Sequence, residues 1–348
     1  MKRLFFNLII VLWFSLMIVF VTGCWELGHI GQYDIQSPTP EEMIGWVNYP
    51  EVFPTCMTDD LQGNIWMGGE VNGTEGLFRF DGKNWQRIPA SVIGISEPVF
   101  VSDVYGADNG KLYVGFKDQG FAIYDGTIWR TYNKQSGLVS DSVTVIRIDK
   151  SSKIWIGTIR GIMQYDGVKW DTFTVNNGLP DNYMITVEID GDNNVICLTP
   201  KGFAQFDRTV KFWIPNSPST GDSVTYFSGV TCDRTGVIWT GLFKPEPYYL
   251  IFYKFINGIW KKEQIDYLAC SPGKFAFDTN NDLWLDLNLG IVKYSQGNIT
   301  EYHSYNQGGY SNAGNSGLLD EYVKGIFIDR HNNKWFLTLS GLSKFELD

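Results

Sequence analysis

The feature of this sequence that most restricts its fold is a repeated pair, an aspartate with an aromatic residue six positions later. Five copies keep both residues: Asp60/Trp66, Asp149/Trp155, Asp233/Trp239, Asp278/Trp284 and Asp329/Trp335. Two further copies keep the spacing but only one of the two residue types: Ala107/Tyr113 and Asp190/Ile196. Successive copies begin between 41 residues apart (149 to 190) and 51 residues apart (278 to 329). A period in this range indicates a solenoid or a propeller.

Each copy has the pattern of four short strands. An apolar run such as residues 143–149 leads to the aspartate, a polar turn follows, and a second run carries the aromatic residue. A glycine followed by an apolar residue, as at Gly161-Ile162, opens a third run. A hairpin then leads to a fourth run that begins with an aromatic residue, and Asp-Gly or Asn-Gly pairs supply the positive φ values that such a hairpin needs. These pairs are Asp81-Gly82, Asp125-Gly126, Asp166-Gly167, Asn257-Gly258 and the variant Gln296-Gly297, and the aromatic residues are Trp85, Trp129, Trp170, Trp213 and Trp260.

Seven such units favour a closed ring over an open stack, because each sheet then packs on its neighbours with aromatic side chains as wedges. The last copy ends after its third run, and Trp46-x-x-Tyr49 matches Trp129-x-x-Tyr132. Residues 44–50 are therefore expected to supply the missing fourth strand. The sequence predicts an all-β fold, a seven-bladed β-propeller of four-stranded antiparallel blades, closed by an N-terminal strand that completes the last blade.

The N-terminus has the pattern of an export signal. Lys2 and Arg3 precede an apolar run over residues 4–20, and Val-Thr-Gly-Cys follows at residues 21–24. This order resembles the bacterial lipobox, in which the cysteine is lipidated and becomes the mature N-terminus. The sequence thus predicts a lipoprotein signal peptide (1–23), lipidation of Cys24, a tether (24–43) and the propeller (44–348). The alternative is an uncleaved membrane anchor; both place the propeller outside the cytoplasm. Trp25 follows Cys24, and an aspartate at this position would retain a lipoprotein at the inner membrane. Trp25 therefore favours the outer membrane if the cell has two membranes.

Composition narrows the possible partners. A formal net charge of −10 argues against binding of nucleic acid, which requires a basic surface, and against electrostatic docking on anionic lipid. Four further cysteines are expected to be buried free thiols, although pairing in an oxidising compartment stays open. They are Cys56, Cys197, Cys232 and Cys270. Because the sequence has neither a Cys-x-x-Cys pair nor a Cys/His cluster with zinc spacing, no metal and no cofactor are expected.

One unit allows a family resemblance to be stated. Residues 149–173, D-x-x-x-x-I-W-I-G-T-x-x-G-I-x-x-Y-D-G-x-x-W-x-x-F, followed by NNGLPDN at 176–182, resemble the two-component regulator propeller repeat. The resemblance covers residues 45–348, and it includes the Gly-Leu pairs at 137–138 and 317–318. It implies a sensing propeller outside the cytoplasm, which in that family is commonly part of a hybrid histidine kinase. Because this sequence shows no kinase or receiver segment, we expect sensing, binding or scaffolding.

A ligand is expected on the face formed by the turns between second and third strands and by the crossings between blades. The sequence predicts enlarged loops on this face at residues 69–75, 242–249 and 303–322. The third loop is rich in Gly, Ser, Asn and Tyr, a composition that suits adaptable polar contacts. The alternative is a set of solvated insertions without function. The candidate ligand-binding residues are Glu70, Asn72, Lys244, Tyr248, Tyr249, His303, Tyr305 and Tyr310.

The sequence leaves two other functions open. Streptogramin lyases are seven-bladed propellers that the repeat faintly resembles, but such chemistry needs a positioned base, usually with a metal. Of the three histidines, His29 lies in the predicted tether, His303 in the long crossing and His331 in a turn on the opposite face. No two of them can meet at one mouth of the ring, so we expect no catalytic residues and no enzyme activity. A structural platform for envelope assembly is the other alternative. The prediction is an exported, lipid-anchored module that binds a glycan, a peptide or a protein.

Overall fold

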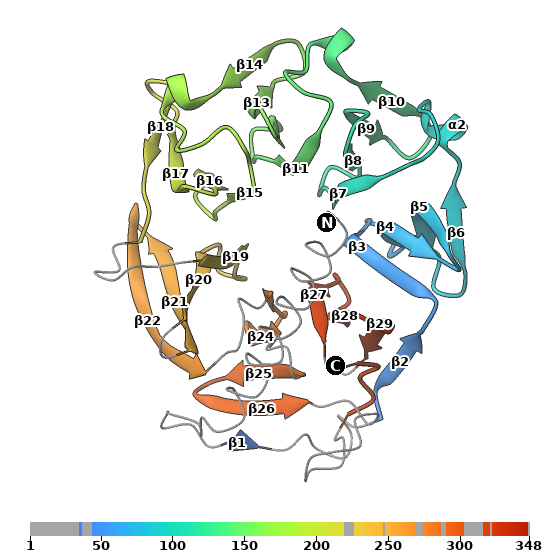
Figure 1. Ribbon diagram of the computed structural model, residues 1–348, viewed down its shortest axis with the longest axis vertical. Coiled ribbons are helices and arrows are strands. Elements are labelled where there is room, and N and C mark those ends of the chain that lie inside the picture. The colour runs from blue at the N-terminus through green and yellow to red at the C-terminus, as the bar shows by residue number, and fades with distance from the viewer. Residues whose placement is uncertain are drawn as a thin grey trace, which may run out of the picture.

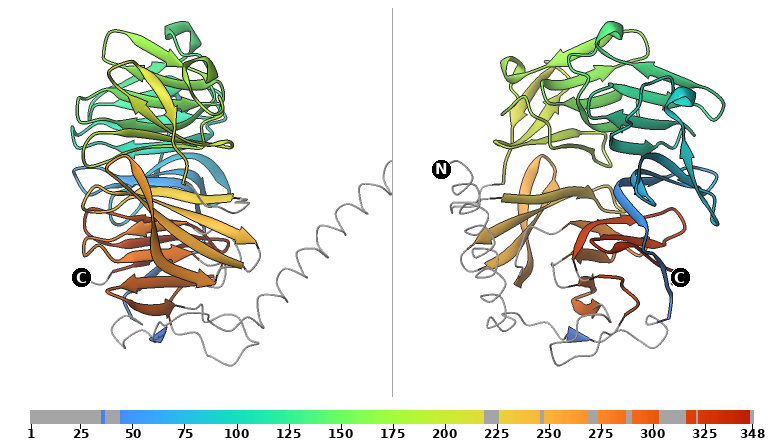
Figure 2. Two further views of the ribbon diagram at one scale, coloured as in Figure 1. Left: turned by 90° about the vertical axis from the view of Figure 1, so that its left-hand side faces the viewer. Right: turned by 45° about the vertical axis from the view of Figure 1, so that its right-hand side comes forward.

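The computed structural model describes residues 35–36, 44–218, 226–245, 248–268, 274–286, 290–302, 316–320 and 322–346. Seven antiparallel sheets, the blades, are arranged around a centre (Figure 1). Each blade begins with a strand at the centre and ends with a strand at the outside. Seen from the side, the ring is a thick disc with the strand ends on its two faces (Figure 2). The predicted fold class is therefore confirmed.

The first four blades follow one another along the chain. They consist of β3 (Val52–Asp59), β4 (Ile65–Val71), β5 (Thr74–Phe80) and β6 (Trp85–Ile88); β7 (Val101–Gly106), β8 (Leu112–Phe116), β9 (Phe121–Tyr124) and β10 (Trp129–Tyr132); β11 (Val143–Ile148), β12 (Ile154–Thr158), β13 (Gly161–Tyr165) and β14 (Trp170–Phe173); and β15 (Thr186–Ile189), β16 (Val195–Thr199), β17 (Gly202–Asp207) and β18 (Phe212–Pro215). Short helices lie in three crossings between blades: α2 (Ala90–Ile93), η1 (Lys134–Ser136) and η2 (Val175–Asn177).

The last three blades complete the ring. They consist of β19 (Tyr226–Cys232), β20 (Ile238–Pro245), β21 (Tyr248–Ile256) and β22 (Ile259–Leu268); β23 (Phe275–Phe277), β24 (Leu283–Asp286), β25 (Ile291–Ser295) and β26 (Asn298–Tyr302); and β27 (Val323–Ile328), β28 (Lys334–Thr338), β29 (Gly341–Phe345) and β2 (Trp46–Tyr49). Among the described residues, no helix is long and apolar enough to cross a membrane.

The predicted closing strand is confirmed. β2 pairs antiparallel with β29, with Trp46 opposite Phe345 and Tyr49 opposite Leu342. The ring of Trp46 packs against Phe345 at 4.9 Å and Phe336 at 5.5 Å between ring centroids. The last blade therefore combines strands from both ends of the described chain (Figure 1). Within the predicted tether, β1 (Ile35–Gln36) pairs parallel with β26 at the outer edge of blade six.

The repeated Asp-to-aromatic spacing has a direct structural reason. In blade three, Asp149 Oδ1 accepts hydrogen bonds from the backbone N–H groups of Ser151 and Lys153, which forms the turn after β11. Its other oxygen, Oδ2, accepts the indole N–H of Trp155 at 3.1 Å. The same carboxylate–indole bond, between 2.7 and 3.1 Å long, occurs in all five copies that keep both residues. The aspartate thus fixes both the turn and the tryptophan that fills the junction with the next blade.

Candidate ligand-binding face

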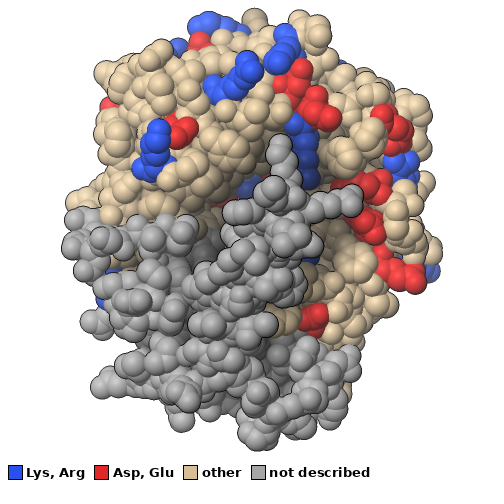
Figure 3. Space-filling view, viewed as in Figure 1, with Lys and Arg blue, Asp and Glu red and all other residues tan. Residues whose placement is uncertain are grey.

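The ring has two faces of different construction. We call upper the face made by the turns between second and third strands and by the crossings between blades. The lower face carries the turns between first and second strands and between third and fourth strands. Figure 3 shows the upper face, with acidic side chains gathered over blade one, at the right of the view.

The loop predicted in blade one is a strand hairpin, which corrects the expectation for residues 69–75. β4 and β5 stay paired as far as Val71 and Thr74, and Glu70 lies opposite Glu75. Asn72 and Gly73 form the turn with φ values of 50° and 73°, the left-handed conformation that an Asn-Gly hairpin adopts. Glu70 and Asn72 therefore project from a paired hairpin on the upper face.

Blade five is taller than the others. β20, β21 and β22 have 8, 9 and 10 residues, whereas β12, β13 and β14 in blade three have 5, 5 and 4. Part of the predicted loop at 242–249 belongs to these strands, with Lys244 opposite Tyr249 and Pro245 opposite Tyr248 in the backbone register. This hairpin rises beyond the upper face in the edge-on view (Figure 2). His303, Tyr305, Tyr310 and Cys24 lie outside the described residues.

The upper face also carries an apolar cluster that the sequence analysis missed. Ile159, Tyr183 and Ile185 expose 42%, 47% and 46% of their surface. The backbone N–H of Met184 donates to Thr158 O at 3.1 Å, so the Tyr183–Ile185 segment lies beside the turn that holds Ile159. These three residues are here called the upper cluster, and they lie on the upper side of blade three and of the crossing that leads into blade four. A group of exposed apolar side chains on one face is typical of a binding site, whereas isolated ones are common on any surface.

Polar groups border the upper cluster. Lys201 lies in the turn between β16 and β17, and its ammonium pairs with Asp181 at 3.0 Å. Asp181 also accepts the backbone N–H of Tyr183 at 3.2 Å, which holds the segment in place. The Lys201 ammonium beside Asp181 keeps the pKa of that carboxyl below its usual value. An apolar centre with a charged, hydrogen-bonding edge is the arrangement found in protein recognition sites.

A second apolar pair lies on the upper side of blade seven. Tyr322 and Leu339 expose 39% and 48% of their surface, and the backbone N–H of Leu339 donates to Tyr322 O at 3.0 Å. Leu339 occupies the turn between β28 and β29, the position that Ile159 has between β12 and β13. The same turn position is therefore apolar and exposed in two blades.

The inner strands carry an ion cluster. Arg147 on β11 pairs with Asp103 on β7 at 2.9 Å and with Glu188 on β15 at 3.3 Å, and its guanidinium lies over the ring of Tyr105 at 5.4 Å. Burial raises the pKa of the Asp103 and Glu188 carboxyls, while Arg147 opposes the shift. Both carboxylates are engaged by the same cation, so the cluster ties three blades together and offers no free base.

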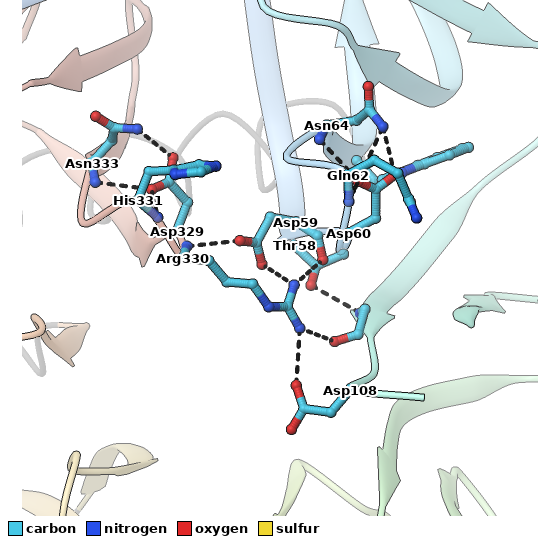
Figure 4. A network of polar contacts seen from close by, with 12 residues as sticks. Thr58, Asp59, Asp60, Gln62, Asn64, Asp108, Asp329, Arg330, His331 and Asn333 are labelled. Carbon is cyan, nitrogen blue, oxygen red and sulfur yellow. Dashed lines mark hydrogen bonds and ion pairs between the residues drawn. The ribbon is translucent and has the colours of Figure 1, made fainter. Parts of the chain in front are cut away.

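A second network of polar contacts lies on the lower face (Figure 4). The Arg330 backbone N–H donates to Asp59 Oδ2 at 2.7 Å, and its guanidinium contacts Asp59 Oδ1 at 2.8 Å. The same guanidinium contacts Gly106 O and Asp108 of blade two, both at 3.2 Å. Burial raises the pKa of Asp59 although Arg330 lowers it. Arg330 therefore joins blade seven to blades one and two.

In the described part of the chain, no hydrogen bond joins a cysteine thiol to His331. Cys56, Cys197 and Cys232 are free thiols, and burial raises their pKa values, to about 12 for Cys56 and for Cys232. Cys197 is buried and the other two are half-buried, while Cys270 lies outside the described residues. His331 lies in a lower turn, where its backbone N–H donates to Asp329. Among the described residues, no group of three His, Cys, Asp or Glu side chains could hold a metal ion.

Comparison with solved structures places the chain among propellers of similar fold. It is similar to the extracellular domain of BT4673 from B. thetaiotaomicron, assigned as a one-component system: the TM-score is 0.67 at 20% identity, over 88% of this chain and 40% of that chain. The extracellular domain of BT3049 from the same organism, assigned as a hybrid two-component system, gives a TM-score of 0.64 at 19% identity, over 89% and 41% of the two chains. Streptogramin B lyase gives a TM-score of 0.65 at 12% identity, over 88% and 99%.

These likenesses concern the fold. The chain spans about 40% of the length of the two extracellular domains it matches. No protein-family model matches the sequence, and no curated protein sequence matches it. The resemblance to the sensing propellers is thus borne out in three dimensions, where this chain and those extracellular domains share one fold.

Proposed function

We propose that this chain is an exported propeller, anchored to the cell envelope through lipid on Cys24, that binds a glycan, a peptide or a protein on its upper face. The observation that carries the proposal is the upper cluster, three apolar side chains each more than 40% exposed beside the Lys201–Asp181 pair. The fold likeness to extracellular domains of one- and two-component systems supports a location outside the cytoplasm.

The chemistry of the upper cluster suits reversible capture. A tyrosine ring provides a rigid apolar surface with a polar tip, and it can pack on a sugar ring or on an apolar peptide side chain. Ile159 and Ile185 add aliphatic surface on either side of it. Burying exposed apolar area contributes about 25 cal/mol per Å², and the charged edge fixes the orientation of what binds.

The proposed function is non-catalytic. The carboxylates of the inner strands are engaged by Arg147, and the free thiols have pKa values that keep them protonated at neutral pH. A lyase reaction would need a base and an electrophile that converge on one point of the upper face. Binding alone requires only the shape and polarity that the upper cluster has.

Glycan and peptide arrays probed with the chain from residue 24 onward test the binding function. Tyr183→Ala and Ile159→Ser should each weaken the strongest signal by about ten-fold, the effect expected of a central contact residue. Val175→Ser is the matched control, because Val175 is 47% exposed but lies in a crossing helix outside the upper cluster. Binding that survives both cluster substitutions would refute the site. A stable co-purifying protein, lost in the same variants, would identify the ligand as a protein.

Fractionation of cells that express the full chain tests the anchor. The native chain should follow the membrane fraction, and mass spectrometry of the purified chain should find residues 1–23 removed and an acylated Cys24 at the N-terminus. If the membrane-bound chain kept residues 1–23, the apolar run at 4–20 would be an uncleaved anchor and the lipoprotein assignment would be wrong.

A further inference from the structure

Two segments of the sequence have the pattern Asn-x-Ser/Thr, which marks an acceptor of N-linked glycans in exported proteins. They are Asn72-Gly73-Thr74 and Asn298-Ile299-Thr300. The asparagine amide nitrogen receives the sugar, and the transferring enzyme binds the hydroxyl two residues later. Because so short a pattern also occurs by chance, the structure around each copy has to decide which of them can serve.

The first copy forms the tip of the blade-one hairpin on the upper face. Val71 and Thr74 are the last paired residues of β4 and β5, and Asn72 and Gly73 form the turn between them. Asn72, Gly73 and Thr74 are all exposed. A Cβ atom placed on Gly73 would find nothing within 4 Å, so open space surrounds the tip. A bulky group on Asn72 would therefore displace no part of the fold.

The side chain of Asn72 is not needed for a structural contact. The residue is tied to the ring through its backbone N–H, which donates to Glu51 O at 3.0 Å. Among the described residues, no hydrogen bond engages its side-chain amide or the Thr74 hydroxyl. Asparagines of the lower turns differ, since Asn193 Oδ1 accepts the Lys150 N–H and Asn333 Nδ2 donates to Asp329. The Asn72 amide is thus available for chemistry.

The second copy is covered by its neighbours. Asn298 is exposed, but Ile299 is only 1% exposed and Thr300 is half-buried. In the backbone register Thr300 lies between two strands, opposite Lys293 on β25 and opposite Gln36 on β1. An enzyme that binds the asparagine and the threonine together cannot reach this copy in the folded ring.

The residue two positions before each asparagine also differs, with Glu70 in the first copy and Gln296 in the second. Bacterial enzymes that transfer N-linked glycans select an acid at this position, where a carboxylate can pair with a cation of the enzyme. Glu70 does not serve the hairpin, because it lies opposite Glu75 and like charges directly opposite each other destabilise a sheet. The acid fits the acceptor pattern and has no structural benefit.

We propose that Asn72 is an N-glycosylation site that receives an oligosaccharide from a polyprenyl-diphosphate donor. The amide nitrogen of Asn72 forms a bond to the anomeric carbon of the donor sugar, and the bond from that carbon to the diphosphate oxygen breaks. The amide gives up one proton, and the polyprenyl diphosphate is the leaving group. The inference rests on the export included in the proposed function, and it does not depend on the upper cluster.

Mass spectrometry of the exported chain, purified from its native cells, tests the proposal. The peptide that contains Asn72 should carry an oligosaccharide, and the peptide that contains Asn298 should not. Asn72→Asp should remove the glycan completely while keeping the turn, since Asp-Gly forms the same hairpin as Asn-Gly. Thr74→Val should also remove it, Thr74→Ser should keep it, and Glu70→Gln should abolish or strongly reduce it.

An exported chain with an unmodified Asn72 would overturn this proposal, as would a glycan that survives Thr74→Val. Equal occupancy of Asn298 would overturn the selection by Glu70 and by the exposed tip. The binding proposal is tested separately, because Asn72→Asp leaves the upper cluster unchanged and the array experiment does not involve Asn72. Thermal melting of the Asn72→Asp and parent chains should nearly coincide, since exposed positions contribute little to stability.

Discussion

The junction between blades three and four and the junction between blades seven and one use the same apolar wedge. Trp155 meets Phe206 edge-on at 4.8 Å between ring centroids, and Trp335 meets Phe80 edge-on at 6.3 Å. In both junctions the tryptophan also donates its indole N–H to the aspartate six residues before it. The repeat thus builds the same interior whether neighbouring blades are adjacent in sequence or come from opposite ends of the chain.

The polar contacts of the two junctions differ. Between blades three and four, the Lys150 backbone N–H donates to Asn193 Oδ1 at 2.9 Å, and the Lys150 ammonium contacts Gly191 O. At the equivalent place between blades seven and one, Arg330 engages the buried carboxylate of Asp59, which is 271 positions away in sequence. Charge-assisted bonds are stronger than neutral ones, and both junctions have them, because Arg147 pairs with Glu188 and Arg208 pairs with Asp149 between blades three and four. The junctions differ at this one turn position, where the closing junction has an ion pair and the other has neutral acceptors.

The largest effect should come from the closing strand. Trp46→Ala should lower the free energy of unfolding by about 3 kcal/mol or more, because it removes the packing of the Trp46 ring on Phe345. No covalent hairpin joins β2 to β29, so the strand depends on this packing and on its backbone pairing. Trp170→Ala, at the same position in blade three, also loses a stacked aromatic partner, but β14 stays joined to β13 by a short turn. Melting of both variants should show a lower melting temperature for Trp46→Ala. Equal melting temperatures would mean that closure adds nothing to the stability of the ring.

A smaller effect is expected from the polar contact. Arg330→Met should cost about 2 kcal/mol at pH 7, less than the 3–5 kcal/mol of a fully buried pair, because 33% of the arginine side chain is exposed. Burial already raises the pKa of Asp59, and loss of the cation should raise it further. A raised carboxyl pKa means that the folded state binds the proton more tightly, so the cost of the substitution should shrink as the pH falls from 7 toward about 4.

Lys150→Met is the matched control for this pH dependence. Lys150 contacts a carbonyl and an amide oxygen, neither of which titrates, so its small cost should stay constant over the same range. Urea unfolding of both variants at several pH values measures the difference. A pH-independent cost for Arg330→Met would show that Asp59 is not the group that the arginine stabilises.

The smallest effect concerns two buried tryptophans of the junction between blades three and four. Trp155 and Trp213 are both fully buried, and among the described residues the indole N–H of Trp213 has no hydrogen-bond partner, whereas that of Trp155 bonds to Asp149. Trp155→Phe should therefore lower the free energy of unfolding by about 1.5 kcal/mol more than Trp213→Phe, the lower end of the range for one hydrogen bond to a charged acceptor. Chemical denaturation measures the free energy of unfolding of both variants. If both lose the same free energy, Asp149 stabilises only its turn and its bond to Trp155 adds nothing.

The repeat and its closing strand were predictable because they recur at a fixed spacing. The regularly spaced tryptophans and Asp-Gly pairs, and the match between Trp46 and Trp129, mark the same turns and packing positions in each copy. The sequence analysis missed the Asn72-Gly73 hairpin, although the Asn-Gly rule used for the outer hairpins also applies to it. The strands β4 and β5 are longer than their counterparts in the regular copies, so their ends were taken for a loop.

The functional surfaces were less predictable because they depart from the repeat. Ile159 and Tyr183 lie near each other only after blades three and four are docked, and each resembles an ordinary strand residue in the sequence. One residue of the closing contact does stand out in the sequence. Asp59 precedes the repeated aspartate Asp60, whereas the equivalent last residue of β11, β15 and β27 is an isoleucine. Its partner could not be inferred, since no repeat relates residues 271 positions apart.

The strand that completes the last blade is synthesised before the other strands of the seven four-stranded blades and finds its place after all of them. Residues 46–49 leave the ribosome about 300 residues ahead of β29, and until β29 is made their outer-strand position does not exist. A chain that stops before β29 would present an open arc with unpaired strand edges at both ends, and such edges invite pairing with other chains. The position of one short strand thus makes closure of the ring depend on synthesis of all seven blades.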